Sequence, residues 1–388
     1  MTTSIFAFVI VLGVLIFFHE LGHFLVARFF GVGVEKFSLG FGPRLVGHKI
    51  GRTDYRVSAI PLGGFVKMVG EEPDAELPPD DLPYSFTHKH VFKRICIVAA
   101  GPTFNLLLAL LIFWGLFWVS GTYILQATVG DVRAESPAGR AGLMTGDRIL
   151  AIDDTTIAGW EEMAAVITAS EGRALRFQIQ REAEIRAVTI TPEMTPDKNL
   201  FGEEIQRYII GVSSAGDVDP RPLGPGGALV EGFRQTYEIT KLTILSIAKL
   251  IQGTVSTKTL GGPIMIAEMA GQQAKEGADN LIFFIALLSI NLAVLNFLPI
   301  PVLDGGHLFF FFIEAIIGRP VNTRMREMAQ QAGIFILIAL IGGVSGYLSR
   351  FFQSPWLIVG GFLGILSFLL SGYWMDRKRD TGITTEIA

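Results

Sequence analysis

Residues 18–24 read Phe18-His19-Glu20-Leu21-Gly22-His23-Phe24, and they follow the uncharged run Ser4–Phe18. On a helix, side chains four residues apart lie on one face about one turn apart, so His19 and His23 can share a metal ion. Glu20 lies beside them, where a carboxylate can take a proton from a water that zinc has made more acidic. The stretch therefore predicts a zinc site with Glu20 as the catalytic base, inside a membrane-spanning helix.

A structural reading of the same motif is a helix whose histidines and glutamate merely face the interior of a bundle. His-Glu-x-x-His arises by chance in on the order of one in a hundred chains of this length. Ionisable groups at membrane depth are costly, however, and are usually functional. The position of the motif within an apolar run therefore favours the metal site.

The whole composition indicates a membrane protein. The chain has 388 residues, of which 50% are hydrophobic and only 18% are charged, and its mean hydropathy is +0.47. A hydrocarbon core needs about 20 apolar residues to cross it. Besides the first run, four uncharged stretches approach or exceed that length: Ile95–Ser120, Leu281–Leu303, Ala332–Ser349 and Phe351–Met375. We therefore expect a multi-pass α-helical membrane protein with about five transmembrane helices.

The distribution of basic residues predicts how the chain is oriented. Lysines and arginines are concentrated in cytoplasmic loops, and here they cluster between the first two spans, between the third and fourth, and after the fifth. The N-terminus and residues 121–280 are then outside, and the C-terminus is cytoplasmic, which for a bacterium means the inner membrane. The net charge of −4, without a basic tract, gives no sign of a nucleic-acid partner.

The segments between the spans differ in character. Residues 31–94 form the inner segment, in which Tyr55–Val69 alternates and predicts a hairpin or strand pair close to the membrane. Residues 121–216 predict an α+β domain, with strands at Leu175–Gln180 and Ala187–Thr191 and a helix near Trp160–Ser170. Residues 217–280 predict a proline-rich linker followed by an amphipathic helix from Gly227 to Ile251.

A third metal ligand is expected from another span, because a catalytic zinc has three protein ligands and one open position. Asp304 is the favoured candidate, since Pro299 and Pro301 interrupt the third span just before it and a glycine pair follows it. Irregular backbone at this depth lines a cavity or is buried in protein. His307 is the rival ligand. Asn296, on the same segment, can hydrogen-bond a substrate backbone or a developing oxyanion.

Taken together, these motifs resemble the site-2 protease family of intramembrane zinc metalloproteases (M50-type), and within it the bacterial regulator-of-sigma-E type. The resemblance covers about residues 1–340. The stretches that carry it are Phe18–Phe24, Phe37–Pro43, Ile60–Met68, Ala100–Asn105 and Asn296–Gly306. It implies zinc held by His19, His23 and Asp304, with Glu20 catalytic and Asn296 near the substrate. It also implies a membrane-associated β-loop in which Gly63, Gly64 and Phe65 engage the substrate.

The same resemblance makes the outer domain PDZ-like, with Ala141–Ile149 as its turn-rich core element. PDZ domains bind an extended peptide at a sheet edge, but a purely structural role is equally open. The domain order is then 1–30, first transmembrane helix; 31–94, β-loop segment; 95–120, second helix; 121–216, PDZ-like domain; 217–280, linker and amphipathic helix; 281–349, catalytic transmembrane helices; 350–388, an additional span and a cytoplasmic tail.

The implied activity is hydrolysis of peptide bonds within the transmembrane segments of single-pass proteins. Such regulated intramembrane proteolysis acts, for example, on a pre-cleaved anti-sigma factor or on remnant signal peptides. Three other classes remain open: a transporter, which should show paired repeats that this chain lacks; an inactive peptide-binding scaffold, which should have lost Glu20; and a protein with a structural metal, which would close the fourth ligand position.

Overall fold

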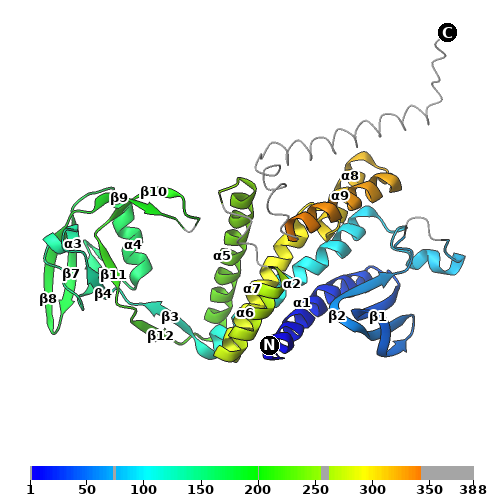
Figure 1. Ribbon diagram of the computed structural model, residues 1–388, viewed down its shortest axis with the longest axis horizontal. Helices are drawn as coiled ribbons and strands as arrows, with labels where there is room; N and C mark the ends of the chain where they lie inside the picture. The colour runs from blue at the N-terminus through cyan, green and yellow to red at the C-terminus, as the bar shows by residue number, and fades with distance from the viewer. Residues whose placement is uncertain (1, 73–75, 200, 255–261, 342–388) are drawn as a thin grey trace, which may run out of the picture. The chain divides into compact units, whose positions relative to one another are not determined.

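A computed structural model describes residues 2–72, 76–199, 201–254 and 262–341 (Figure 1). The chain divides into two compact units. One comprises Met1–Phe113 together with Gly232–Ala388, and the other comprises Trp114–Glu231. The first unit carries the candidate site and consists mainly of helices, and the second is an α+β unit.

Three helices of the described residues are long and apolar enough to cross a membrane: α1 (Thr2–Phe29), α2 (Val91–Ser120) and α7 (Ala278–Phe297). They correspond to the first three expected spans. The fourth, Ala332–Ser349, begins in α9 (Thr323–Ile341) and then leaves the described residues. The fifth, Phe351–Met375, and the whole of 350–388 lie outside them.

Helix α1 is surrounded by other elements of its unit. In Figure 1, α6 (Pro263–Glu276) and α7 run beside it, and the β1–β2 hairpin lies against it. One face of its first half is buried in an apolar core with α2, α6 and α7, to which Ala7, Val11, Leu15, Leu108, Ala270, Phe284 and Ile285 contribute. This packing holds the histidine-bearing second half of α1 in place.

The inner segment forms a curled antiparallel hairpin of β1 (Val34–Ile50) and β2 (Thr53–Met68). Its register pairs Val34 with Met68 and Ile50 with Thr53, and residues 36–39 are partnered with both 54–57 and 64–67. Gly40 has a φ of +92°, which a side chain would disfavour, and it lies where β1 bends. The strand character expected of Tyr55–Val69 is confirmed, but the turn is not within it: this stretch belongs to the single strand β2, whose partner is the preceding strand β1. A short 3-10 helix, Pro79–Tyr84, follows it.

The base of this hairpin packs into the helices. Residues of β1 and β2 share a buried apolar core with α1, α2 and α8 (Asp304–Ile317), formed by Ala27, Val32, Val34, Phe37, Val66, Met68, Phe86, Ile97, Val98, Leu308 and Phe311. This core adjoins the histidine half of α1. The hairpin is therefore held against the helices that carry the candidate ligands.

The expected break after the third span is confirmed. Helix α7 ends at Phe297 and α8 begins at Asp304, with both prolines in the turn between them. The glycine pair permits the turn, because a Cβ on Gly305 would come within 2.0 Å of the Leu298 carbonyl oxygen and one on Gly306 within 2.4 Å of that of Ile300. The break thus places Asp304 at the first residue of a new helix.

A buried ion pair ties the start of α2 to α8. The Arg94 guanidinium makes two hydrogen bonds to the Glu314 carboxylate, and both side chains are only 9% exposed. Arg326 of α9 approaches the same carboxylate at 3.5 Å. Arg94 and Arg326 belong to the two basic clusters that flank the second and third expected spans, and the structure shows both side chains directed to a buried carboxylate. Their cluster anchors α8, whose first residue is Asp304.

The second unit confirms the helix and strands expected within it. Helix α4 (Trp160–Ala169) packs beside a four-stranded sheet of order β6-β5-β7-β8. The strands of this sheet are β5 (Arg148–Ile152), β6 (Thr155–Thr156), β7 (Leu175–Arg181) and β8 (Glu184–Ile190). The short helix α3 (Pro137–Arg140) lies in the same unit.

Further strand pairs complete this unit. Strand β4 (Val129–Val132) pairs with β11 (Val212–Ser214), and β9 (Glu193–Lys198) pairs with β10 (Glu204–Ile209). In the turn-rich element, the Asp147 carboxylate is 1% exposed and accepts hydrogen bonds from Arg181 and from the backbone N–H of Met144. Burial opposes its ionisation, but these bonds hold the pKa of Asp147 below its ordinary value.

The expected linker differs from the structure at its start. Residues 218–221 are not irregular but form strand β12 (Val218–Arg221), which pairs with β3 (Thr122–Leu125). Proline lacks a backbone donor but is tolerated in an edge strand, and in a two-stranded ribbon both strands are edges. The α+β unit therefore extends past residue 216, and helix α5 (Pro225–Ile251) follows after Pro222.

Candidate metal centre

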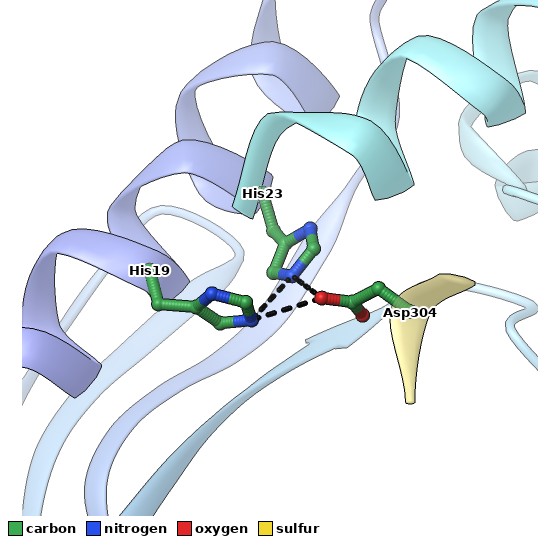
Figure 2. A group of neighbouring side chains, drawn as sticks. All are labelled: His19, His23 and Asp304. Atoms are coloured by element: carbon green, nitrogen blue, oxygen red, sulfur yellow. Dashed lines mark hydrogen bonds and ion pairs between the residues drawn. The ribbon is translucent and has the colours of Figure 1, made fainter. Parts of the chain in front are cut away.

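Three side chains from two helices converge on one point (Figure 2). His19 and His23 come from adjacent turns of α1, and Asp304 comes from the first turn of α8. The two Nε2 atoms are 3.2 Å apart, and they lie 3.0 Å (His19) and 3.6 Å (His23) from Asp304 Oδ2. Among the described residues this is the group of His, Cys, Asp and Glu side chains that could hold a metal ion.

The geometry fits a tetrahedral zinc ion. Bonds of about 2.0–2.1 Å to such an ion separate its ligand atoms by about 3.3 Å, and the three measured separations bracket this value. Asp304 Oδ2 is buried and has no partner other than the two imidazole nitrogens. Two neutral nitrogens and one carboxylate oxygen form a donor set that zinc prefers, with room for a fourth ligand.

The Nδ1 atom of each imidazole, which points away from the three-residue group, also has a polar neighbour. His23 Nδ1 lies 2.9 Å from the Ile97 carbonyl oxygen, which can only accept a hydrogen bond. The proton of His23 is therefore on Nδ1, and its Nε2 presents a lone pair to the site. His19 Nδ1 lies 3.2 Å from the side-chain amide of Asn105, on α2.

Two glycines allow α1 and α2 to approach closely at the site. A Cβ on Gly22 would lie 2.4 Å from the Ala100 carbonyl oxygen, and one on Gly101 would lie 2.3 Å from His23 Nε2 and 2.9 Å from His19 Cε1. Gly101 thus leaves the space that the two imidazoles occupy. Small residues are a common means of close helix packing in membranes.

Glu20 lies between the candidate ligands and strand β2. Its side chain is hydrogen-bonded to the backbone of Val66 and interacts electrostatically with His19, His23 and Asp304. Its neighbour on β2 is Gly64, where an added Cβ would come 3.3 Å from Glu20 Cγ and 2.7 Å from Ile16. A glycine at position 64 therefore brings the strand against the carboxylate expected to act as the base.

The remaining candidate residues lie on strand β2, in the last turn of α7 and in α8. Phe65 stacks on Phe41 with ring centroids 6.1 Å apart, and a Cβ on Gly63 would collide with that Phe41 ring. Asn296 is 9% exposed in the last turn of α7, and within the described chain no hydrogen bond joins it to the three ligands. His307 does not belong to the metal group, which Asp304 completes instead.

Sequence reasoning missed the partners of these residues. The Ile97 carbonyl, the Asn105 amide and the Val66 backbone each act on a residue 46 to 86 positions away in the chain. The element Ala100–Asn105 was noticed as a motif, but only the packing of α2 on α1 shows that Gly101 and Asn105, four residues apart, face the histidines.

Comparison with known proteins gives a consistent result. The sequence profile of Peptidase family M50 matches residues 7–340. A Mesorhizobium japonicum protein named "putative zinc metalloprotease" is 37% identical over 351 residues, covering 87% of this chain and 96% of its own. Proteins of the same descriptive name from Agrobacterium fabrum (35% identity; 88% and 94%) and Rickettsia conorii (36%; 87% and 96%) are similar.

Replacing Gly101 tests the space left for the imidazoles. Gly101→Ala adds a methyl group within van der Waals overlap of His23, so we expect zinc affinity to fall at least about tenfold. The measurement is zinc per chain and chelator competition on the purified protein. Gly115→Ala is the matched control, because nothing lies within 4 Å of the added atom on the same helix. Equal zinc affinity in both variants would contradict the packing described.

Proposed function

The chain belongs to peptidase family M50 and is a zinc-dependent metalloendopeptidase of the membrane, and we propose that it cuts peptide bonds within the transmembrane segments of single-pass membrane proteins. The observation that carries this proposal is the placement of the metal group. Its two histidines lie on a 28-residue apolar helix and its carboxylate lies at a break between two apolar helices. The reaction is therefore assigned to membrane depth.

We assign His19, His23 and Asp304 as the zinc ligands and Glu20 as the catalytic base. Zinc, when bound, polarises the scissile carbonyl and makes water more acidic. Glu20 takes the proton of the attacking water and returns it to the departing amine. The Val66 backbone and Gly64 of strand β2 lie beside the Glu20 side chain. The side chains of the ligands are 10–19% exposed, so the fourth position has limited access to solvent.

Strand β2 is proposed as the element that holds the substrate. A helical substrate hides its carbonyls, so it must be extended before it can be cut. Residues 64–67 of β2 pair with 36–39 along one edge, and the Val66 backbone and Gly64 lie beside Glu20 on α1. Among the described residues no strand pairs along their other edge. A substrate segment added at that edge would gain backbone hydrogen bonds beside the base. Gly63, Gly64 and Phe65 lie on this part of the strand, and Asn296 is proposed to bind the substrate from α7.

The α+β unit is proposed to be a PDZ-like domain outside the cytoplasmic membrane that admits substrates already shortened by an earlier cut. It forms a compact unit of its own, and the chain enters it through β3 and leaves it through β12, which pair with each other. The basic inner loops support the orientation, with the N-terminus outside and the C-terminus in the cytoplasm. Pre-cleaved anti-sigma factors and remnant signal peptides are substrates of the required kind.

The position of the cut tests the proposed activity. The purified protein is reconstituted in lipid with a model single-pass protein, and the new chain ends are identified by mass spectrometry. We expect both ends to fall within the apolar segment, with cleavage stopped by a zinc chelator and restored by added zinc. The control is a substrate with an uninterrupted leucine helix, which should be cut more slowly. New ends only in the flanking loops would contradict intramembrane cleavage.

Excision of the α+β unit tests the proposal that this unit excludes substrates that have not yet been shortened. Gly121 and Pro222 lie next to each other, since a Cβ on Gly121 would be 3.1 Å from Pro222 Cα, so residues 122–221 can be removed with the ends joined directly. We expect the shortened enzyme to cut a full-length substrate as fast as a pre-cleaved one, whereas the intact enzyme prefers the pre-cleaved form. The proposed exclusion by size is wrong if the enzyme without residues 122–221 still cuts the pre-cleaved substrate faster than the full-length one.

A further inference from the structure

The partner of His19 Nδ1 is the feature from which a further role follows. His19 can bind zinc through Nε2 only if that atom carries a lone pair, and a neutral imidazole then carries its proton on Nδ1. The atom facing Nδ1 must therefore be a hydrogen-bond acceptor. In His23 this requirement is met by the Ile97 carbonyl oxygen at 2.9 Å. In His19 the neighbour at 3.2 Å is the amide of Asn105, which has both a donor and an acceptor.

The surroundings of Asn105 show which of its atoms can serve. The residue is fully buried, and its backbone is held by Ser289, whose hydroxyl donates to the Asn105 carbonyl oxygen at 2.7 Å. Asn105 Oδ1 is buried without a hydrogen-bond partner, whereas Nδ2 faces His19. A half-turn of the amide about its Cβ–Cγ bond exchanges the two atoms. It brings the unpartnered oxygen to the Nδ1 proton of His19.

We propose that Asn105 is a positioning residue of the zinc site, which accepts a hydrogen bond from His19 Nδ1 through Oδ1 and so commits Nε2 to the metal. This inference rests on the proposed zinc ligands. Outer partners of this kind fix the tautomer and ring orientation of a ligating histidine, and their loss weakens metal affinity about 10- to 100-fold. Asn105 and Gly101 thus act together from one face of α2, one holding His19 and the other leaving it space.

Two substitutions separate an acceptor from a donor at this position. Asn105→Asp retains only acceptors and reproduces the carboxylate–histidine–zinc arrangement common in zinc sites. Asn105→Leu has a similar volume and no polar atom. An acceptor role predicts that the Asp variant binds zinc as tightly as wild type and the Leu variant more weakly. A donor role predicts that both variants lose affinity.

The experiment measures the zinc dissociation constant of full-length protein in detergent by competition with a chromophoric chelator. We expect Asn105→Leu to raise the dissociation constant at least about tenfold, with Asn105→Asp close to wild type. The matched control is Asn291→Leu, which removes another membrane-helix amide, bonded to Thr243 at 2.8 Å, and should leave zinc binding unchanged. Thermal unfolding of each variant, with and without zinc, checks that the protein is folded.

Each result decides the role. Unchanged affinity in a folded Asn105→Leu variant would overturn the proposal, as would a loss in Asn105→Asp as large as in Asn105→Leu. If the Leu variant does not fold, the Asp variant alone still decides, because it has no amide donor. Failure of the proposed zinc site itself is distinguishable, since the wild-type protein would then bind no zinc.

Discussion

Three polar atoms must meet in an apolar environment, and most of the described structure around the site follows from that requirement. The Nε2 atoms of His19 and His23 and Oδ2 of Asp304 lie within 3.0–3.6 Å of one another. Their meeting requires α1 and α2 to touch through glycines and α8 to begin at the correct depth. Burying polar groups costs free energy unless they are hydrogen-bonded or hold a metal. Each histidine accordingly has a neighbour at its Nδ1 atom, and the three facing atoms have the spacing of metal ligands.

The chemistry of the site could be predicted from short-range patterns. The four-residue spacing of the histidines on a helix needs no tertiary information, and the prolines and glycines around Asp304 mark a break that can be recognised locally. The contacts that hold these residues in place could not be predicted. Arg94 and Glu314 are 220 positions apart, and Asn105 is 86 positions from His19, so only the packed fold brings them together. The strand at Val218–Arg221 was missed because Pro220 and the prolines that follow it indicate a linker until the partner strand β3 is known.

The elements around the site divide the work of proteolysis. In the proposed assignment, helix α1 supplies two of the three ligands and the base, and α8 supplies the third ligand, a carboxylate. Helix α2 contacts the imidazoles through Ile97, Gly101 and Asn105. Strand β2 lies on the other side of Glu20, where a substrate in extended form would be next to the base. The proposed chemistry needs all of these elements at once, so changes in α2, which carries no ligand, should also weaken zinc binding.

The most direct test of the account is to replace Glu20 with Gln in the purified protein and to measure bound zinc and cleavage of a single-pass substrate together. The account predicts about one zinc per chain, as in wild type, because Glu20 is not a ligand. It also predicts that cleavage falls at least about 10²-fold, because the base is lost. Cleavage that persists with zinc in place would contradict the role of Glu20. A wild-type protein that binds no zinc would contradict the assignment of His19, His23 and Asp304.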